Sequence, residues 1–111
     1  MSHIYKIFRP AEWAQLQRNG STAGAPIDVA DGFIHFSGAD TLQGTLDKWF
    51  TDAGPLVIAE YDPDTLGPEL RWEESRGGAL FPHLYAPLQA AHTLRHWTVE
   101  PDGQGRYTPF P

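Results

Sequence analysis

Glycine and proline, scattered along the whole chain, limit what this sequence can fold into more than any other feature. There are 11 glycines and 10 prolines among 111 residues, well above the roughly 12% that the two residues average together. Proline interrupts helix interiors and central strands, and glycine weakens both. The helices and strands must therefore be short and joined by ordered loops, which favours a mixed α+β domain over a helical bundle.

Length and composition narrow the class of protein further. A chain of 111 residues, 41% hydrophobic and 13% aromatic, has enough apolar residues for one core and is no disordered acidic tail. We expect a single domain over residues 1–111, with its core at about 3–100 and a loosely ordered tail at 101–111. Cysteine is absent, so disulfides, thiolate nucleophiles and cysteine-based zinc sites are excluded.

Charge and hydropathy bear on partners and location. The net charge is −6 and there is no cluster of lysine or arginine, which disfavours binding to nucleic acid. No apolar run reaches the roughly 20 residues that span a bilayer, and the N-terminus lacks the long apolar stretch of a signal peptide. We expect a cytoplasmic location and no membrane partner. The sequence predicts neither the oligomeric state nor a protein partner.

Apolar periodicity and turn residues predict two main helices. The first begins with Pro10 in its first turn and ends at residues 19–20, where Asn-Gly is a typical C-terminal signal. The second has an apolar stripe at i, i+4, i+7 and i+8, formed by Leu42, Leu46, Trp49 and Phe50. Ser37 is placed to cap the second helix. The small residues at 20–31 predict a loop.

Strands are expected where β-prone or alternating residues lie between turn signals. They fall at residues 3–8, 32–36, 56–61, 69–73 and 93–100. Residues 81–87 are bracketed by prolines and should also be extended. In the strand at 69–73, Leu70 and Trp72 should face the core, with Arg71 and Glu73 on the opposite face.

The sequence contains no strong catalytic motif of the P-loop, nucleophile-elbow or zinc-protease kind. Polar residues instead lie within apolar surroundings in three segments, 31–37, 71–75 and 81–85. In the first segment, strand alternation puts His35 and Ser37 on one face with Phe33. His35 is then either a core histidine whose nitrogens bind protein groups, or an imidazole facing a ligand at the floor of a cleft.

Three further candidate residues come from the other segments. Glu73 either belongs to a solvated charged face or lies in a partly apolar cleft, where a carboxylate can stabilise a developing cation or act as a base. His83 and Tyr85 share a face of an extended segment that prolines stiffen, as in a structural turn or one wall of a pocket. No metal site is expected, because His35, His83 and Glu73 lack any local ligand spacing.

Several of these motifs together resemble a known bacterial family. They are IYKI at 4–7, Trp13, DGFIHFS at 31–37, LVIAEYD at 56–62, RWEES at 71–75 and LFPHLYAPL at 80–88. In order and spacing they are similar to the family catalogued as domain of unknown function 952. The resemblance covers about residues 3–97, almost the whole domain.

The resemblance implies a fold and a ligand. The family is similar to the ADP-ribosyltransferase superfamily, in which two packed, mostly antiparallel sheets form a split cleft for NAD. By position, Lys6 would anchor the ribose or phosphate, and residues 34–37 would correspond to the strand that sandwiches nicotinamide. Glu73 is the best match to the catalytic glutamate that stabilises the oxocarbenium ion, and Glu100 is the next.

These observations lead to one functional expectation and two alternatives. We expect a nucleotide-like ligand in a cleft, with NAD as the candidate substrate and chemistry at its nicotinamide–ribose bond, as in an ADP-ribosyl-transferring enzyme. The cleft would be lined by His35, Ser37, Glu73, His83 and Tyr85. One alternative is a ligand-sensing module without catalysis. The other is a protein-interaction domain in which His35, Trp72 and His83 only pack between the sheets.

Overall fold

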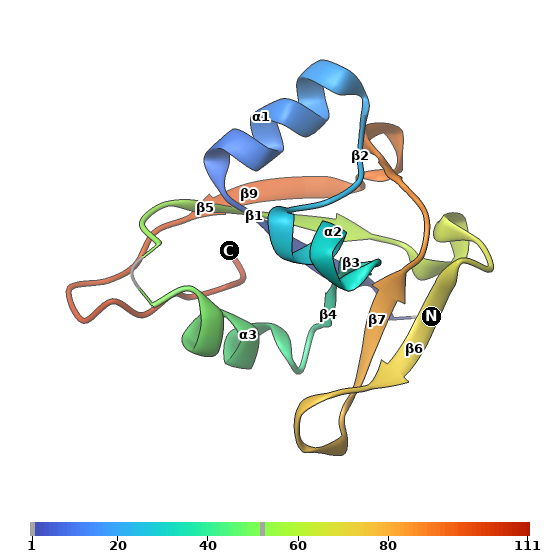
Figure 1. The fold of residues 1–111 in the computed structure, drawn as a ribbon. Helices are drawn as coiled ribbons and strands as arrows, with labels where there is room; N and C mark the ends of the chain where they lie inside the picture. The colour runs from blue at the N-terminus through green and yellow to red at the C-terminus, as the bar shows by residue number, and fades with distance from the viewer. Residues whose placement is uncertain (1, 52) are drawn as a thin grey trace.

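The computed structural model describes residues 2–51 and 53–111, which form a mixed α+β fold with antiparallel strand pairing (Figure 1). Its α-helices are α1 (Pro10–Asn19), α2 (Pro26–Asp31) and α3 (Leu42–Trp49). The expected α+β class is confirmed. The expectation of two main helices was incomplete, because a third short helix lies between them.

A four-stranded sheet forms the centre of the molecule. Its order is β4-β1-β5-β9, with β4 at Ser37–Gly38, β1 at Ile4–Phe8, β5 at Leu56–Tyr61 and β9 at Arg95–Val99. Every residue of β1 and β5 is buried, because both faces of these strands are covered. Both strands were predicted, β5 with the same bounds.

The two faces of this sheet pack into separate hydrophobic clusters. One face packs against α1 and the three-stranded sheet through Ile4, Phe8, Val57, Ala59 and Tyr61. The other face packs against α3 through Tyr5, Ile7 and Ile58. Strand alternation along β1 therefore turns Lys6 to the side of Ile4 and Phe8, away from α3.

The three-stranded sheet has the order β3-β7-β6, with β3 at Ile34–His35, β7 at Leu80–Leu84 and β6 at Leu70–Glu74. A small ladder joins β2 (Ser21–Thr22) to β8 (Leu88–Gln89). The 3₁₀-helices η1 (Pro63–Leu66), η2 (Arg76–Gly78) and η3 (Ala90–His92) fill the connections. None of the helices in the described ranges is long and apolar enough to cross a membrane.

The strand expected at 32–36 is shorter, with only residues 34–35 in β3, and a second short strand follows it in the other sheet. His35 ends β3 in the three-stranded sheet, and Ser37 begins β4 beside β1. Phe36 lies between them, is buried, and donates its backbone N–H to the Pro82 carbonyl over 3.0 Å. The chain thus passes from one sheet to the other within one residue.

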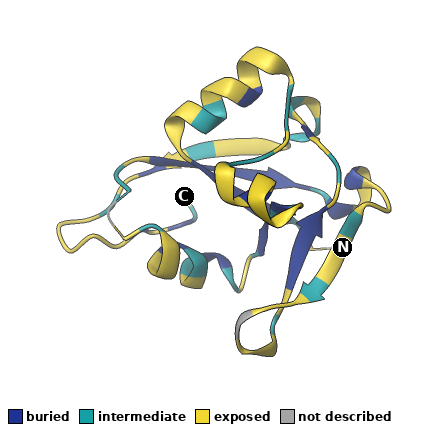
Figure 2. Cartoon of the chain, viewed as in Figure 1, coloured by how far each residue is buried: buried dark blue, intermediate teal, exposed yellow. Residues whose placement is uncertain are grey.

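The loop expected at residues 20–31 was wrong, because this segment contains β2 and α2. Pro26 occupies the first turn of α2, and Asp28 accepts the N–H of Ala25 at its N-terminus. Gly32, with φ +87°, ends the helix. These are ordinary helix signals, but six residues are too few to show a clear apolar period. Apart from Asp28, the described residues of α2 are not buried (Figure 2).

Three smaller expectations also need correction. Trp72 is 43% exposed, because β6 is an edge strand and Leu70 alone of the pair packs against the core. Ser37 does not cap a helix: it lies in β4 and its hydroxyl is 2.9 Å from that of Thr45. The second predicted helix is α3, which ends at Trp49. The side chain of Trp49 was expected in the buried apolar stripe but is 60% exposed.

Residues 101–111 contain no helix or strand but lie against the core. Tyr107 is buried and donates its hydroxyl to the Gly54 carbonyl over 2.6 Å. Trp97 donates its indole N–H to the Pro109 carbonyl, and Phe110 packs edge-on against Tyr5. The segment therefore covers the face of the central sheet that α3 leaves open.

Candidate functional site

An open cavity of about 600 Å³ lies where the two main sheets meet α2 and α3. Of the predicted site residues, Lys6, His35, Ser37 and His83 line it. Glu73 and Tyr85 are not in its lining. The structure therefore brings four of the six predicted residues to one cavity and places the other two behind His83.

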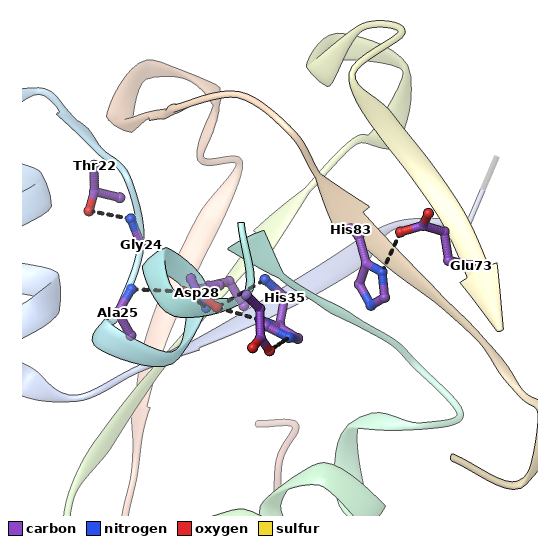
Figure 3. Close-up of polar contacts among 9 residues, drawn as sticks. Thr22, Gly24, Ala25, Asp28, His35, Glu73 and His83 are labelled. Atoms are coloured by element: carbon purple, nitrogen blue, oxygen red, sulfur yellow. Dashed lines mark hydrogen bonds and ion pairs between the residues drawn. The ribbon is translucent and has the colours of Figure 1, made fainter. Parts of the chain in front are cut away.

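Asp28, which the sequence analysis did not single out, is at the centre of this arrangement. It is 1% exposed and accepts hydrogen bonds from four donors (Figure 3). They are Lys6 Nζ at 2.9 Å, Ala25 N at 2.7 Å, His35 N at 3.1 Å and His35 Nδ1 at 2.6 Å. One carboxylate thus holds β1, the start of α2 and β3 together.

These donors also set the ionisation of Asp28. Burial alone would raise its pKa, but the bond from His35, the charge and bond of Lys6 and the N–H of Ala25 outweigh burial and lower the pKa to about 2. A carboxylate that accepts several hydrogen bonds beside a cation is stabilised in its charged form. Asp28 is therefore a fixed negative charge beneath the cavity.

His35 is held by carboxylates at both ring nitrogens. Its Nδ1 contacts Asp28, and its Nε2 is 3.1 Å from Asp31 Oδ2. The side chain remains 36% exposed and lines the cavity. A core histidine satisfied on all sides does not describe this residue, because part of its ring is open to solvent.

A second carboxylate–imidazole pair lies on the same face of the three-stranded sheet. Glu73 Oε1 accepts from His83 Nδ1 and from the Tyr85 hydroxyl, both at 2.7 Å. These two bonds lower the pKa of Glu73, with the Tyr85 bond contributing most, and the Glu73 carboxylate raises the pKa of Tyr85. Glu73 is therefore a partner of His83 rather than a wall of the cavity.

Phe33 joins the two pairs. Its ring centroid lies 4.6 Å from that of His35, 4.1 Å from His83 and 5.2 Å from Tyr85. His35 and His83 are also direct cross-strand partners in the β3–β7 ladder. The expectation that Phe33 shares a face with His35 agrees with this packing.

The opposite rim of the cavity is aromatic and carries a cation. Trp49 and Phe50 line it, and the Arg9 guanidinium lies 4.9 Å above the Phe50 ring. Lys6 is paired with Asp28, whereas Arg9 forms no ion pair with a carboxylate within the described ranges. The sequence analysis missed Arg9 and Asp31 as well as Asp28.

The cavity is not arranged as a metal centre. Across residues 2–51 and 53–111, no group of three or more His, Asp or Glu side chains is placed to hold a metal ion. His35 and His83 each direct Nδ1 at a carboxylate of their own. The site therefore consists of two carboxylate-bound imidazoles, a guanidinium and aromatic walls.

Acid should weaken the fold through Asp28. Its pKa is about 2 in the folded chain against an ordinary 3.8, so the unfolded chain takes up the proton first as the pH falls. The stabilisation is complete above about pH 4 and is lost as the pH falls towards 2, by about 2 kcal/mol. Urea unfolding at pH 5 and 2.5 measures the loss, and an NMR titration of the Asp28 carboxyl carbon tests its origin. A titration midpoint of the Asp28 carboxyl near its ordinary 3.8 would show that Asp28 is not the source of the loss.

Comparisons with known proteins agree with this description. The structure defines a small α+β domain in which two antiparallel sheets and two short helices surround an open cavity. The family model "Protein of unknown function (DUF952)" matches residues 7–96, and the chain belongs to this family. None of the curated proteins compared with the chain matches it.

Two solved structures of one bacterial protein are similar to the chain. The X-ray crystal structure of protein CC0527 from Caulobacter crescentus is 41% identical, with 96% of this chain and 94% of that chain covered and a TM-score of 0.93. Its solution NMR structure is 42% identical, with coverage of 96% and 91% and a TM-score of 0.85. The similarity supports the fold over nearly the whole length.

Proposed function

We propose that this domain binds a nucleotide-like small molecule in the cavity. The observation that carries the proposal is the position of His35, which is fixed by buried Asp28 and still partly exposed in the wall of an open cavity. A fixed polar group in a mostly apolar concave surface is typical of a small-molecule site. The volume of about 600 Å³ lies within the usual range of such sites.

The groups around the cavity suit the separate parts of a nucleotide. The exposed ring of Trp49 offers a flat apolar surface for a base, since aromatic rings stack well with bases. The guanidinium of Arg9 offers charged donors that match a phosphate. His35 and Asp31 supply hydrogen-bonding groups for a sugar hydroxyl.

Binding, rather than reaction at the nicotinamide–ribose bond, is the function that we assign. The resemblance assigns that reaction to Glu73, but Glu73 lies outside the lining and is already bound to His83 and Tyr85. The link to the ADP-ribosyltransferase superfamily rests on the resemblance alone. NAD and ADP-ribose are therefore ligands to test.

Replacing Arg9, the cation at the rim of the cavity, should weaken the binding of phosphate-bearing ligands and leave the binding of nucleosides unchanged. We expect AMP and ADP-ribose to raise the melting temperature more than adenosine does, as linkage requires of tighter ligands. Arg9→Gln should weaken AMP binding by about 10-fold or more, the size of a lost charge-assisted hydrogen bond, and leave adenosine unchanged. Isothermal titration calorimetry measures both affinities.

Arg18→Gln is the matched control, because Arg18 is exposed in the last turn of α1 and does not line the cavity. It should bind AMP as the wild type does. If folded protein binds neither nucleotides, NAD nor nucleosides, the proposal is wrong, and the protein-interaction alternative takes its place.

A further inference from the structure

The two histidines of the cavity form a pair with the same local design. His35 and His83 face each other across the β3–β7 ladder, with ring centroids 5.5 Å apart and planes at 67°. Each directs Nδ1 at a carboxylate, Asp28 at 2.6 Å for His35 and Glu73 at 2.7 Å for His83. Such a contact fixes the ring orientation and leaves Nε2 as the reactive nitrogen.

The second nitrogen of His83 is in contact with solvent, although the side chain is largely buried. Every fully buried side-chain nitrogen or oxygen of the described residues has a hydrogen-bond partner. Nε2 of His83 has none among these residues, so this atom is not fully buried. Since His83 lines the cavity, its exposed Nε2 is available there. Figure 3 shows the ring extending away from Glu73.

The two rings differ in what lies beside Nε2. An ionised carboxylate only accepts, so a ring nitrogen bound to it carries a proton. Nδ1 of His35 is hydrogen-bonded to Asp28, and its Nε2 lies at an ion-pair distance of 3.1 Å from Asp31 Oδ2, a contact that is favourable only when this nitrogen carries a proton. His83 has such a contact at Nδ1 only, which leaves its Nε2 able to accept.

We propose that His83 and His35 act as general base and general acid in the hydrolysis of a phosphodiester bound in the cavity. Displacement at phosphorus in a single step can use a base on the entering oxygen and an acid on the leaving oxygen at the same time. Acyl transfer can instead use one imidazole twice, first as base and then as acid. Two adjacent imidazoles of opposite proton content therefore favour phosphorus. The inference rests on the proposed function, since the substrate must bind in this cavity.

The step balances with water as the only co-reactant. His83 Nε2 takes a proton from a water molecule while the water oxygen forms a bond to phosphorus. The bond from phosphorus to the leaving oxygen breaks, its electron pair stays on that oxygen, and His35 Nε2 donates its proton there. A leaving oxygen would replace Asp31 as the acceptor of this proton. The products are a phosphomonoester and an alcohol, and solvent returns the proton from His83 to His35.

The test measures turnover, with bis(p-nitrophenyl) phosphate, adenylyl-3′,5′-adenosine and 2′,3′-cyclic AMP as probes. We expect hydrolysis of at least one of them. His35→Gln and His83→Gln should each lower the rate by about 100-fold or more, the usual contribution of a general acid or base. His92→Gln is the control, because His92 in η3 does not line the cavity, and it should keep the full rate.

The pH profile separates a chemical role from a structural one. The wild-type rate should rise and then fall with pH; His83→Gln should lose the rise and His35→Gln the fall. The titratable and charged groups facing the two rings are Asp28 and Asp31 from α2, Arg71 and Glu73 from β6 and Tyr85 after β7, with Lys6 of β1 against Asp28. If His83→Gln fails to fold, Glu73→Gln replaces it and should lower the rate by roughly 10-fold or more.

The outcomes distinguish this inference from the proposed function. If nucleotides bind but none of the three probes is hydrolysed, the acid–base pair is refuted and the binding site stands. Turnover that survives His83→Gln, or Glu73→Gln in its place, with an unchanged pH profile also refutes it. Absence of any nucleotide binding removes both proposals together.

Discussion

Replacing Asp28 with asparagine is expected to lower the free energy of unfolding by about 3–5 kcal/mol, the usual cost of removing one partner of a buried ion pair. The substitution keeps the size of the side chain but removes the charge that holds Lys6, which is itself buried. It also replaces one of the two acceptor oxygens with an amide NH2 group, so the side chain can no longer accept both from Lys6 and Ala25 and from His35. Urea unfolding at pH 7 measures the change.

Two further variants show whether the loss comes from the pair. Asp64→Asn, on the exposed surface of η1, should change the stability by no more than about 0.5 kcal/mol. Adding Lys6→Met to Asp28→Asn should recover part of the loss, because no unpaired buried ammonium then remains. A loss below about 1 kcal/mol for Asp28→Asn would show that Asp28 does not hold these elements together.

Gly24→Ala should be the most damaging of the glycine substitutions around the site, at about 2–4 kcal/mol. Gly24 has φ +106°, and an added Cβ would lie 2.5 Å from both the Cβ and Oδ2 of Asp28. Asp28 cannot move aside, because its carboxylate is held by four donors. Thermal and urea unfolding measure the cost, and the ring NMR signals of His35 should shift.

Gly32→Ala is the matched control for Gly24→Ala. Gly32 also has a positive φ, +87°, but an added Cβ would meet no atom within 4 Å. Its cost should be that of backbone strain alone, about 1–2 kcal/mol. Equal costs for the two variants would mean that the packing of Asp28 against Gly24 adds nothing to stability.

The central strands could be predicted because burial on both faces leaves a run that is apolar at nearly every position. Residues 56–61 read LVIAEY and form β5 with the expected bounds. The exposure of Trp72 could not be predicted in the same way, because alternation gives only the face of a strand. Whether that face is covered depends on β6 being an edge strand, a matter of tertiary structure.

Some of the residues that line the cavity could be singled out from the sequence for a related reason. His35 and His83 stand out as polar residues within apolar segments, and both line the cavity. Asp28 lies among small residues in a helix too short for a visible period, although the combination of Pro26, an acidic third residue and Gly32 is a helix signal. The contact of Glu73 with His83 needs the β6–β7 register, in which Glu73 faces Phe81, and local sequence does not give register.

The passage of the chain between sheets at Phe36 makes residues 34–38 sensitive to length. Successive residues of a strand point to opposite faces, so one inserted residue reverses every side chain beyond it. After an insertion here, only one of the two sheets could keep its register. If β4 kept its pairing with β1, His35 would turn out of the cavity; if β3 kept its pairing with β7, Ser37 would turn away from Thr45. Insertions and deletions should therefore be excluded from this segment during divergence.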